Sequence, residues 1–257
     1  FSRELFELEI PVIPPVILAG KSIFEFEGFQ LAAFPMFVGR PLELDSYENL
    51  LVMGRFIGRI HSVGAEASFL DRLEINIDRF AVQSREFLLG NDFIPADLLA
   101  AYDTLTQDLI LRVETCFSAH GSIKKIRIHG DCHSGNVLWK DNAPNFVDFD
   151  DTMNGPAIQD LWMMLSGSRD QRQAQLIELL KGYNEFFHFP TAELSLIESL
   201  RTLRIMNYSA WLARRWDDPA FPRNFPWFNS VRYWSEHILQ LREQLSALEE
   251  PPLEVLV

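Results

Sequence analysis

One stretch of the sequence, residues 127–151 (RIHGDCHSGNVLWKDNAPNFVDFDD), constrains the fold and the chemistry of the chain most strongly. It contains two histidines, one cysteine, three asparagines and five aspartates. An apolar strand is predicted at 126–128, and two more at 137–139 and 145–149 around the turn sequence KDNAP. Acceptor side chains on such a strand, loop and hairpin suit a metal cluster, a hydrolase site or a phosphate-handling site.

Composition excludes several classes of protein. Of the 257 residues, 47% are hydrophobic, which is enough for a buried core, and the net charge of −13 argues against a nucleic-acid partner. No apolar run reaches the ~18–20 residues of a membrane span, and no secretory signal opens the chain. Two cysteines, Cys116 and Cys132, are too few for a disulfide scaffold. We therefore expect a cytoplasmic protein with no membrane partner.

The predicted elements fall into a small strand-containing piece, 1–40, and a larger, mostly helical piece, 41–257. A helix opens the first piece without a cap or an initiator methionine, which indicates a fragment. A hairpin at 23–26 and 29–34 and a Pro/Gly-punctuated linker follow, and residues 65–94 are expected to be irregular with some helix. The predicted helices of the larger piece span 45–64, 95–119, 156–166, 170–187, 191–216 and 230–248.

Three interpretations of the acidic stretch are poorly supported by the sequence. A zinc site would use His129, Cys132 and His133, but no second ligand pair at matching spacing follows. A nucleophilic Cys132 lacks any family signature, and the surrounding acids would raise the pKa of its thiol. A turn rich in Asp and Asn accounts for one or two such residues, but not for the ordered set.

Phosphoryl transfer accounts for the order of the set. Asp131 and Asn136 are five residues apart on a loop that leaves a strand, and Asp148 follows a short hairpin. An aspartate can orient an attacking hydroxyl and accept its proton, while an asparagine and a second aspartate hold Mg²⁺ against triphosphate oxygens. Such chemistry depends mainly on positioning and charge neutralisation, which a few fixed residues can provide.

The sequence resembles a known family at these residues. HGDCHSGN followed by FVDFDD is similar to the catalytic loop and metal-binding segment of the aminoglycoside phosphotransferase and choline kinase group, which shares the protein kinase fold. The kinase pattern His-x-Asp-x-x-x-x-Asn coincides with His129, Asp131 and Asn136. The stretches GPAIQDLW, 155–162, and WDDPAFPRNFPW, 216–227, resemble more specifically the bacterial stress response kinase A family.

The resemblance implies an α+β, protein kinase-like fold of two lobes, with a truncated N-terminal lobe and a mostly helical C-terminal lobe. It implies a serine/threonine protein kinase that uses ATP and Mg²⁺ and takes part in a stress response. In that family Asp131 would be the catalytic base, and Asn136 and Asp148 the Mg²⁺ ligands. His129 would support the loop, and Asp160 would fix the loop backbone or, alternatively, serve only as a first-turn helix acid.

The resemblance also implies the places of the two substrates. The linker at 34–40 would be the hinge, where Met36 or Phe37 gives a backbone N–H to adenine, and Leu138 and Val147 would lie against the purine. The acceptor would meet a C-terminal helix. Side chains at helical spacing there are Arg201, Arg204, Tyr208, Trp211 and Arg215. The alternative for this stripe is ordinary helix packing with arginines paired to nearby acids.

Several parts of a kinase have no counterpart in the sequence. None of the five lysines lies in a Val-x-Ile-Lys-like strand before the hinge, and AGKS at 19–22 lacks the first glycine of a phosphate-binding loop. We therefore expect weak phosphoryl transfer by this chain and a monomeric, active full-length form. Two alternatives remain: a small-molecule hydroxyl kinase of the aminoglycoside, choline or homoserine type, and a non-catalytic pseudokinase.

Overall fold

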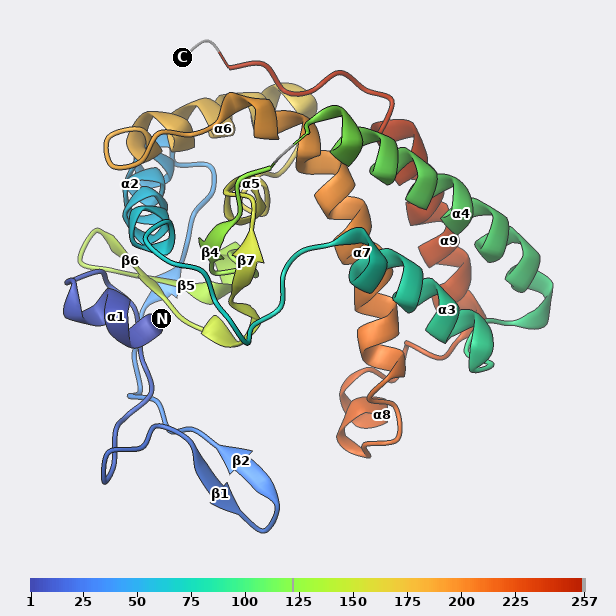
Figure 1. Cartoon of the computed structure of the whole chain (residues 1–257), viewed down its shortest axis with the longest axis horizontal. Helices are drawn as coiled ribbons and strands as arrows, with labels where there is room; N and C mark the ends of the chain where they lie inside the picture. The colour runs from blue at the N-terminus through green and yellow to red at the C-terminus, as the bar shows by residue number, and fades with distance from the viewer. Residues whose placement is uncertain (122, 256–257) are drawn as a thin grey trace. The chain divides into compact units, whose positions relative to one another are not determined.

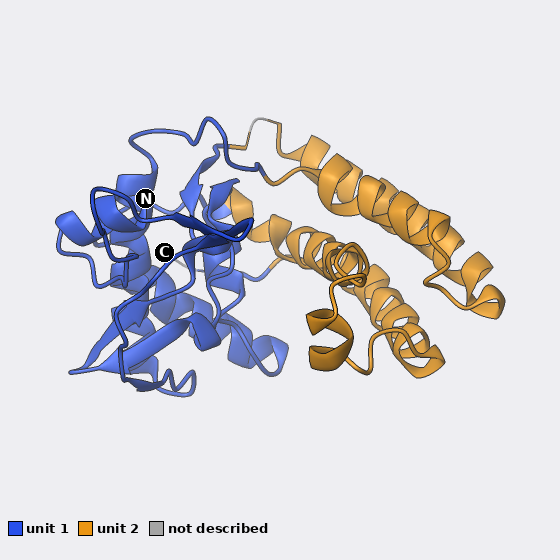
Figure 2. Ribbon diagram, turned by 90° about the horizontal axis from the view of Figure 1, so that it is seen from below, with its two compact units in different colours: residues 1–74, 124–191, 253–257 blue, residues 75–123, 192–252 orange. Residues whose placement is uncertain are grey.

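The computed structural model describes residues 1–121 and 123–255. Its internal contacts divide the chain into two compact units, coloured separately in Figure 2: unit 1 is residues 1–74, 124–191 and 253–257, and unit 2 is residues 75–123 and 192–252. Among the described residues, no helix has both the length and the apolar composition needed to cross a lipid bilayer. The division at residue 40 rests on the family resemblance and stays a prediction.

Small antiparallel sheets lie in unit 1 (Figure 1). The strands are β1 (Phe24–Phe26), β2 (Phe29–Leu31), β3 (Arg40–Pro41), β4 (Ile126–Ile128), β5 (Val137–Lys140), β6 (Ala143–Phe146) and β7 (Met153–Gly155). They pair as β1–β2, as β3–β5–β6 and as β4–β7. All residues of β4 and β7 are buried, so this pair forms a rigid base for the loops at its ends.

The helices of unit 1 are α1 (Ser2–Glu7), α2 (Tyr47–Gly64), α5 (Ile158–Trp162) and α6 (Arg169–Tyr183). Two of them, α2 and α6, begin at side-chain caps. Ser46 caps α2 by accepting from the backbone N–H of Asn49, and Ser168 forms a capping box with Gln171 at the start of α6. These interactions satisfy N–H groups that a helix leaves unpaired at its first turn.

Glycines bring α2 and α6 into direct backbone contact. A Cβ atom added to Gly54 would lie 1.9 Å from the carbonyl oxygen of Leu179, and one added to Gly182 would lie 2.0 Å from that of Leu51. Real Cβ atoms do not approach so closely, so any larger residue at these positions would push the helices apart. The close crossing also brings His61 of α2 into contact with Tyr183 at the end of α6.

Arg127 of β4 holds α1 against the rest of unit 1. Its guanidinium donates to both carboxylate oxygens of Glu4, at 2.6 and 3.0 Å, and to the carbonyl of Val63 at 2.8 Å. The ring of Phe1 covers the same guanidinium at 4.7 Å. The hydrogen bond from Arg127 lowers the pKa of Glu4. A nearly buried charge is stable only with such partners, so this contact fixes where α1 lies.

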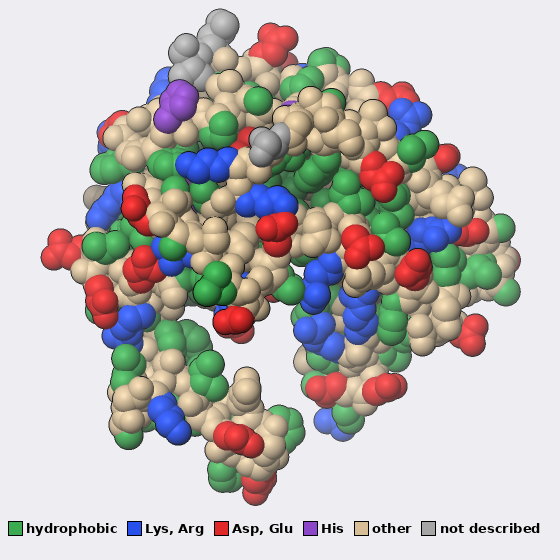
Figure 3. Space-filling view, viewed as in Figure 1, with side chains coloured by type: hydrophobic (Ala, Val, Ile, Leu, Met, Phe, Trp, Pro, Cys, Tyr) green, Lys and Arg blue, Asp and Glu red, His purple; other side chains and the backbone are tan. Residues whose placement is uncertain are grey.

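Unit 2 is helical in the part of the chain that the structure describes. It contains the π-helical turn η1 (Asp78–Val82), α3 (Gln83–Gly90), α4 (Ala96–Ala119), α7 (Ile197–Ala213), α8 (Ala220–Asn224) and α9 (Val231–Ala247). Its core includes Tyr102 of α4 and Trp234 and His237 of α9, which are buried and in ring contact. Figure 3 shows Lys and Arg side chains gathered over α7.

The predicted hairpin after the catalytic loop was shifted. Strand β6 covers Ala143–Phe146 rather than 145–149, because the connecting turn consists of Asp141 and Asn142 alone. Both turn residues have positive φ, 52° and 60°, as two-residue hairpin turns require. Asp148 then adopts a left-handed backbone, with φ 61° and ψ 66°, and residues Phe149–Asp151 form a 3₁₀ turn, η3. A strand cannot continue through that conformation.

Two of the predicted helices were too long. The helix predicted at 156–166 is the short α5, which ends at Trp162, and Gly167 with φ 84° precedes the cap of α6. The helix predicted at 191–216 begins as a 3₁₀ helix, η4 (Thr191–Leu196), before α7. In both cases the apolar periodicity of the sequence continues past the residue where the backbone geometry changes. Periodicity alone therefore does not locate the end of the helix.

Candidate active site

A glycine allows the loop after β4 to lie directly against the segment after β6. Gly130 has φ 86°, and a Cβ atom there would lie 2.2 Å from the carbonyl oxygen of Asp151. Both the left-handed conformation and the close approach require glycine. The loop of residues 129–136 and the turn of residues 149–152 are thus adjacent, which brings the three predicted acidic and amide residues into one region.

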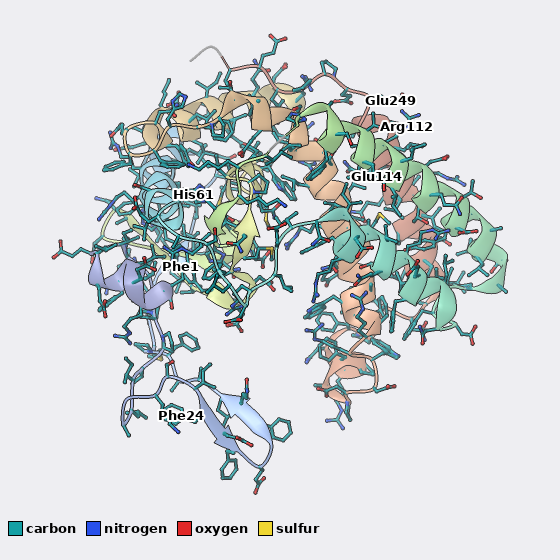
Figure 4. All side chains as sticks on the ribbon, in the orientation of Figure 1. Phe1, Phe24, His61, Arg112, Glu114 and Glu249 are labelled. Atoms are coloured by element: carbon teal, nitrogen blue, oxygen red, sulfur yellow. The ribbon has the colours of Figure 1, made fainter. Side chains whose placement is uncertain are left out.

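Asp160 of α5 fixes the backbone of this loop. One carboxylate oxygen accepts from the N–H of His129 at 2.7 Å and the other from the N–H of Gly130 at 2.9 Å. His61 of α2, labelled in Figure 4, lies 3.0 Å from the first oxygen through its Nε2 atom. Burial acts to raise the pKa of Asp160, but the hydrogen bond and charge of His61 and the N–H of Gly130 outweigh it and hold that pKa below its usual value.

The other side of His61 is also bonded. Its Nδ1 atom lies 2.9 Å from the hydroxyl of Tyr183 at the end of α6. Nε2 donates to the carboxylate in either protonation state, while Nδ1 accepts from the Tyr183 hydroxyl in a neutral ring and donates to it in a protonated one. A buried chain of hydrogen bonds therefore runs from α6 through α2 and α5 to the loop backbone.

His129 joins the loop to the segment that carries Asp148. Its Nε2 atom donates to the carbonyl of Val147 at 2.9 Å, and its ring packs on Phe149 with centroids 4.5 Å apart. The N–H of Val147 in turn donates to the carbonyl of Asn136 at 3.0 Å. These contacts tie the two halves of the acidic stretch together on either side of the hairpin.

Asp131 and Asn136 are in direct contact. The Asn136 amide nitrogen donates to the Asp131 carbonyl at 3.0 Å and lies 3.3 Å from a carboxylate oxygen. His133 Nε2 lies 3.4 Å from the same carboxylate oxygen, while its Nδ1 accepts from the N–H of Gly135. The loop therefore holds the Asp131 carboxylate from two sides, and the Asn136 amide keeps its oxygen as the remaining acceptor.

A cavity of about 350 Å³ opens beside these residues. Its lining is apolar except at one end: Ile13, Phe34, Pro35, Phe37, Leu138, Val147, Asp148 and Asp150. Within the described chain, neither the Asp148 nor the Asp150 carboxylate has a hydrogen bond or an ion pair. Cavities of this size, with few polar groups, are typical of small-molecule sites.

The structure places the predicted nucleotide residues unequally. Phe37, Leu138 and Val147 line the cavity, whereas the Met36 side chain is 92% exposed and does not. The role expected of Met36 concerns its backbone N–H, so it stays a prediction. The tetrad predicted for the acceptor, Arg201, Arg204, Trp211 and Arg215, lies on α7 and just after it, in unit 2.

Sequence reasoning missed several residues of this region. His61 and Tyr183 lie on helices far from the acidic stretch, and only their positions on buried helix faces could have indicated them. Ile13 lies in a segment broken by prolines, and no periodicity marked it as a cavity residue. Asp150 lies in the segment FVDFDD but was not singled out, and His133 was considered only as a zinc ligand.

Comparison with known proteins gives related sequences over almost the whole chain. The family described as "Phosphotransferase enzyme family" matches residues 2–195. "Stress response kinase A" of Shigella flexneri is 41% identical over 255 residues, which cover 99% of this chain and 77% of that protein. "Serine/threonine protein kinase RdoA" of Salmonella typhimurium is 40% identical over 255 residues, with the same coverage of 99% and 77%.

Solved structures resemble the chain at low sequence identity. The amicoumacin kinase hAmiN, in complex with AMP-PNP, Ca²⁺ and Ami, has a TM-score of 0.70 at 19% identity. The match covers 98% of this chain and 76% of the hAmiN chain. An AMP-bound spectinomycin phosphotransferase has a TM-score of 0.61 at 18% identity, with 97% and 83% covered. At these identities the likeness shows the fold alone, and it confirms the predicted α+β, kinase-like fold.

Proposed function

Because the chain belongs to the phosphotransferase enzyme family and, within it, to the stress response kinase A group, we propose that it transfers the γ-phosphoryl group of ATP to a serine or threonine hydroxyl of a protein. The observation that carries the proposal is the cavity with an apolar lining and an acidic end, next to the loop that holds Asp131 and Asn136. The predicted family membership is confirmed by the 40–41% identity.

The apolar part of the cavity suits a purine ring. Phe34 and Phe37 contribute aromatic rings to its lining, and Leu138 and Val147 of the lining belong to the segments around the hairpin. Van der Waals contact with such side chains gives affinity, and a backbone N–H at Met36 or Phe37 would give specificity for adenine. The triphosphate would extend toward Asp148 and Asp150, where the polar part of the lining lies.

The residues at the acidic end fit a hard cation. The Asp148 carboxylate makes no ion pair among the described residues, and the Asn136 nitrogen is already bonded, which leaves an amide oxygen. Both Asp148 and Asp150 are exposed, so their carboxylates are open to a cation that arrives with the nucleotide. Mg²⁺ takes carboxylate and amide oxygens together with phosphate oxygens, and it supplies charge neutralisation when bound. Asn136 and Asp148 would hold it.

Asp131 is the acid best placed to meet the acceptor. Its carboxylate is held by Asn136 and His133, and the backbone that carries it is fixed by Asp160. We assign to Asp131 the orientation of the attacking hydroxyl and the acceptance of its proton. Asp160 and His129 would act as positioning residues, since Asp160 bonds the backbone of the loop and His129 ties the loop to the backbone of Val147.

The acceptor class is proposed on the names of the relatives. The Salmonella relative is called a serine/threonine protein kinase and the Shigella relative a stress response kinase, so we propose a protein acceptor and a role in stress. A small hydroxyl compound is the alternative, because the fold is shared with an amicoumacin kinase and a spectinomycin phosphotransferase. We also propose that the protein is cytoplasmic and monomeric in its full-length form.

The first test is the Asp131→Asn variant of the full-length protein. We expect phosphoryl transfer from radiolabelled ATP to a generic protein substrate to fall about 10²–10⁴-fold, with ATP affinity nearly unchanged, because only the base and orienting group is lost. Asp141→Asn is the matched control, since Asp141 lies in the hairpin turn where Asn is also well tolerated. Activity of Asp131→Asn within threefold of wild type would exclude the assignment, and transfer to small hydroxyl compounds alone would favour the alternative acceptor.

The second test addresses the cation site through Asp148. The variant Asp148→Asn is preferable to Asp148→Ala because the left-handed backbone at this position, φ 61°, favours asparagine. We expect the variant to lose most of the increase in ATP affinity that Mg²⁺ gives the wild type. Calorimetric titration of ATP with and without Mg²⁺ measures this directly. An unchanged Mg²⁺ effect would point to Asp150 or Asp151 instead.

A further inference from the structure

The solvent-facing side of α7 and the residues just after it carry an excess of positive charge. Residues 197–215 contain four arginines and a single acid, Glu198, in a chain whose net charge is −13. Arg201 lies 3.5 Å from Glu198 and is locally compensated. The buried positions of α7 are occupied by other residues, which shows that the arginine stripe is not part of the core.

Three arginines form a cluster without an acidic partner in the described part of the chain. Arg214 donates to the carbonyl of Gln83 at 3.2 Å and lies over the ring of Phe87, while Arg215 donates to the carbonyl of Trp211. Arg79 lies on η1, which packs against α7. Partial burial and then the charges of Arg79 and Arg215 lower the pKa of Arg214, so the cations repel one another without local neutralisation.

An aromatic surface adjoins the cluster. The rings of Tyr208 and Trp211 stack with centroids 6.0 Å apart and an angle of 10°, and the Arg215 guanidinium lies 4.6 Å above the Trp211 ring. Tyr208 is 41% exposed. Phe221 packs on Trp211 at 5.3 Å and keeps this ring in place. Stacked guanidinium and aromatic groups are pre-organised, so little conformational entropy is lost when they bind a ligand.

We propose that this surface of unit 2, formed by Arg79, Arg214, Arg215, Tyr208 and Trp211, binds an acidic segment of the protein acceptor. The identification of the anion as part of a protein rests on the proposed function. Guanidinium groups bind carboxylates through paired, charge-assisted hydrogen bonds, and the exposed Tyr208 ring offers contact to apolar side chains of the same segment. A cluster of cations beside a stacked pair of rings offers contacts to several residues of an extended peptide, whereas a compact ion would use the cations alone.

The charge of the rest of the protein strengthens this selectivity. An acidic partner is repelled by a surface of net charge −13, except where positive charge is concentrated. Such a local patch steers association and depends strongly on ionic strength. The proposal therefore requires that binding weaken with added salt, and that a basic peptide of the same length fail to bind at this surface.

The test measures peptide binding in the absence of nucleotide. The probe is a short Glu-rich peptide with one tyrosine, one serine and a fluorescein label. Its binding to the whole chain is measured by fluorescence anisotropy. We expect Arg79→Gln/Arg215→Gln to weaken binding about tenfold or more, because each lost guanidinium removes a charged hydrogen bond. Arg214 is left intact because it bonds the backbone of α3.

The matched control is Arg232→Gln/Arg242→Gln, which removes the same charge from exposed positions of α9. Equal weakening in both double variants would show a non-specific charge effect and would overturn the proposal. Absence of peptide binding, or tighter binding of a short RNA, would also overturn it. Arginine-dependent peptide binding by a protein that transfers no phosphoryl group would retain the surface while rejecting the kinase function.

Discussion

Two buried histidines from different units, His61 and His237, have opposite electrostatic surroundings. His61 of unit 1 lies between the Asp160 carboxylate and the Tyr183 hydroxyl. Among the described residues, His237 of unit 2 has only the hydroxyl of Ser209 within hydrogen-bond distance, and its ring is stacked against the Tyr233 ring. Burial lowers the pKa of His237 to about 4, so this ring is neutral at physiological pH.

The difference between the histidines shows where the protein keeps a buried charge. A buried carboxylate is costly unless several donors bind it, and Asp160 is retained with donors from His61, His129 and Gly130. The unit 2 core, by contrast, has neutral groups around His237, which is the ordinary solution for a core. Charge retained at such cost is a mark of a functional region, and here it fixes the loop that carries Asp131.

Among the variants that test this difference between the units, Asp160→Asn is expected to change stability and activity the most. The amide keeps the shape of the side chain but presents an NH₂ group to one of the backbone N–H donors of the loop. Removal of one partner from a buried charged network costs about 3–5 kcal/mol in the free energy of unfolding. Phosphoryl transfer should fall as well, because Asp131 is displaced. Urea denaturation and an activity assay measure the two effects.

Ser209→Ala is the control in unit 2. It removes the hydroxyl that lies next to His237 and also bonds the Tyr233 hydroxyl, and each of these neutral hydrogen bonds contributes about 1 kcal/mol. We expect the catalytic activity of this variant to match the wild type. If Asp160→Asn were no more destabilising than Ser209→Ala, the buried charge in unit 1 would have no special energetic role.

The next largest expected effect is a pH dependence of the free energy of unfolding, which is due to His237. Its folded pKa of about 4 lies below the ordinary 6.5, so between these values the unfolded chain binds more protons than the folded one. The stability contributed by the neutral ring is present above pH 6.5 and is lost as the pH falls toward 4. Between pH 7 and pH 5 the loss should be about 2 kcal/mol.

The measurement compares urea denaturation at both pH values for wild type and His237→Gln. The variant should lose about 2 kcal/mol less than the wild type on acidification, since its side chain does not titrate. His188→Gln is the control, because His188 is exposed. A pH dependence that is the same in His237→Gln and in wild type would contradict the neutral, desolvated state of this ring.

The two histidines also show what the sequence could and could not predict. The loop was predictable because His129, Asp131 and Asn136 follow a spacing in one short segment, and Phe37, Leu138 and Val147 were found in the cavity lining. His61 and Tyr183 were missed because their contact depends on the glycine-mediated crossing of α2 and α6. That crossing is a tertiary event, and helix periodicity reports only which face is buried.

The same limit applies to the arginines of unit 2. Helical spacing grouped Arg201, Arg204 and Arg215, but the structure pairs Arg201 with Glu198. Arg79 and Arg214 join the cluster because the π-helical turn η1 packs on α7. Charge compensation between neighbouring elements is set by their packing, so the sequence predicted a basic stripe but not its uncompensated part.

The smallest expected effect concerns the outer end of the hydrogen-bonded chain in unit 1. Tyr183→Phe keeps the ring, which packs edge-on against His61, Phe187 and Phe189, and removes only the hydroxyl that bonds His61 Nδ1. The free energy of unfolding should fall by about 1 kcal/mol, and activity should fall less than in Asp160→Asn, because Asp160 keeps all its donors. Tyr233→Phe, which removes a hydroxyl bonded to Ser209 in unit 2, should cost a similar stability and no activity.

A double-mutant cycle between Tyr183→Phe and Asp160→Asn decides whether the hydrogen bonds from Tyr183 to Asp160 act cooperatively. A coupling energy near zero would mean that His61 holds Asp160 without help from α6, whereas a coupling of about 1 kcal/mol would show that the packing of α6 is transmitted to the loop.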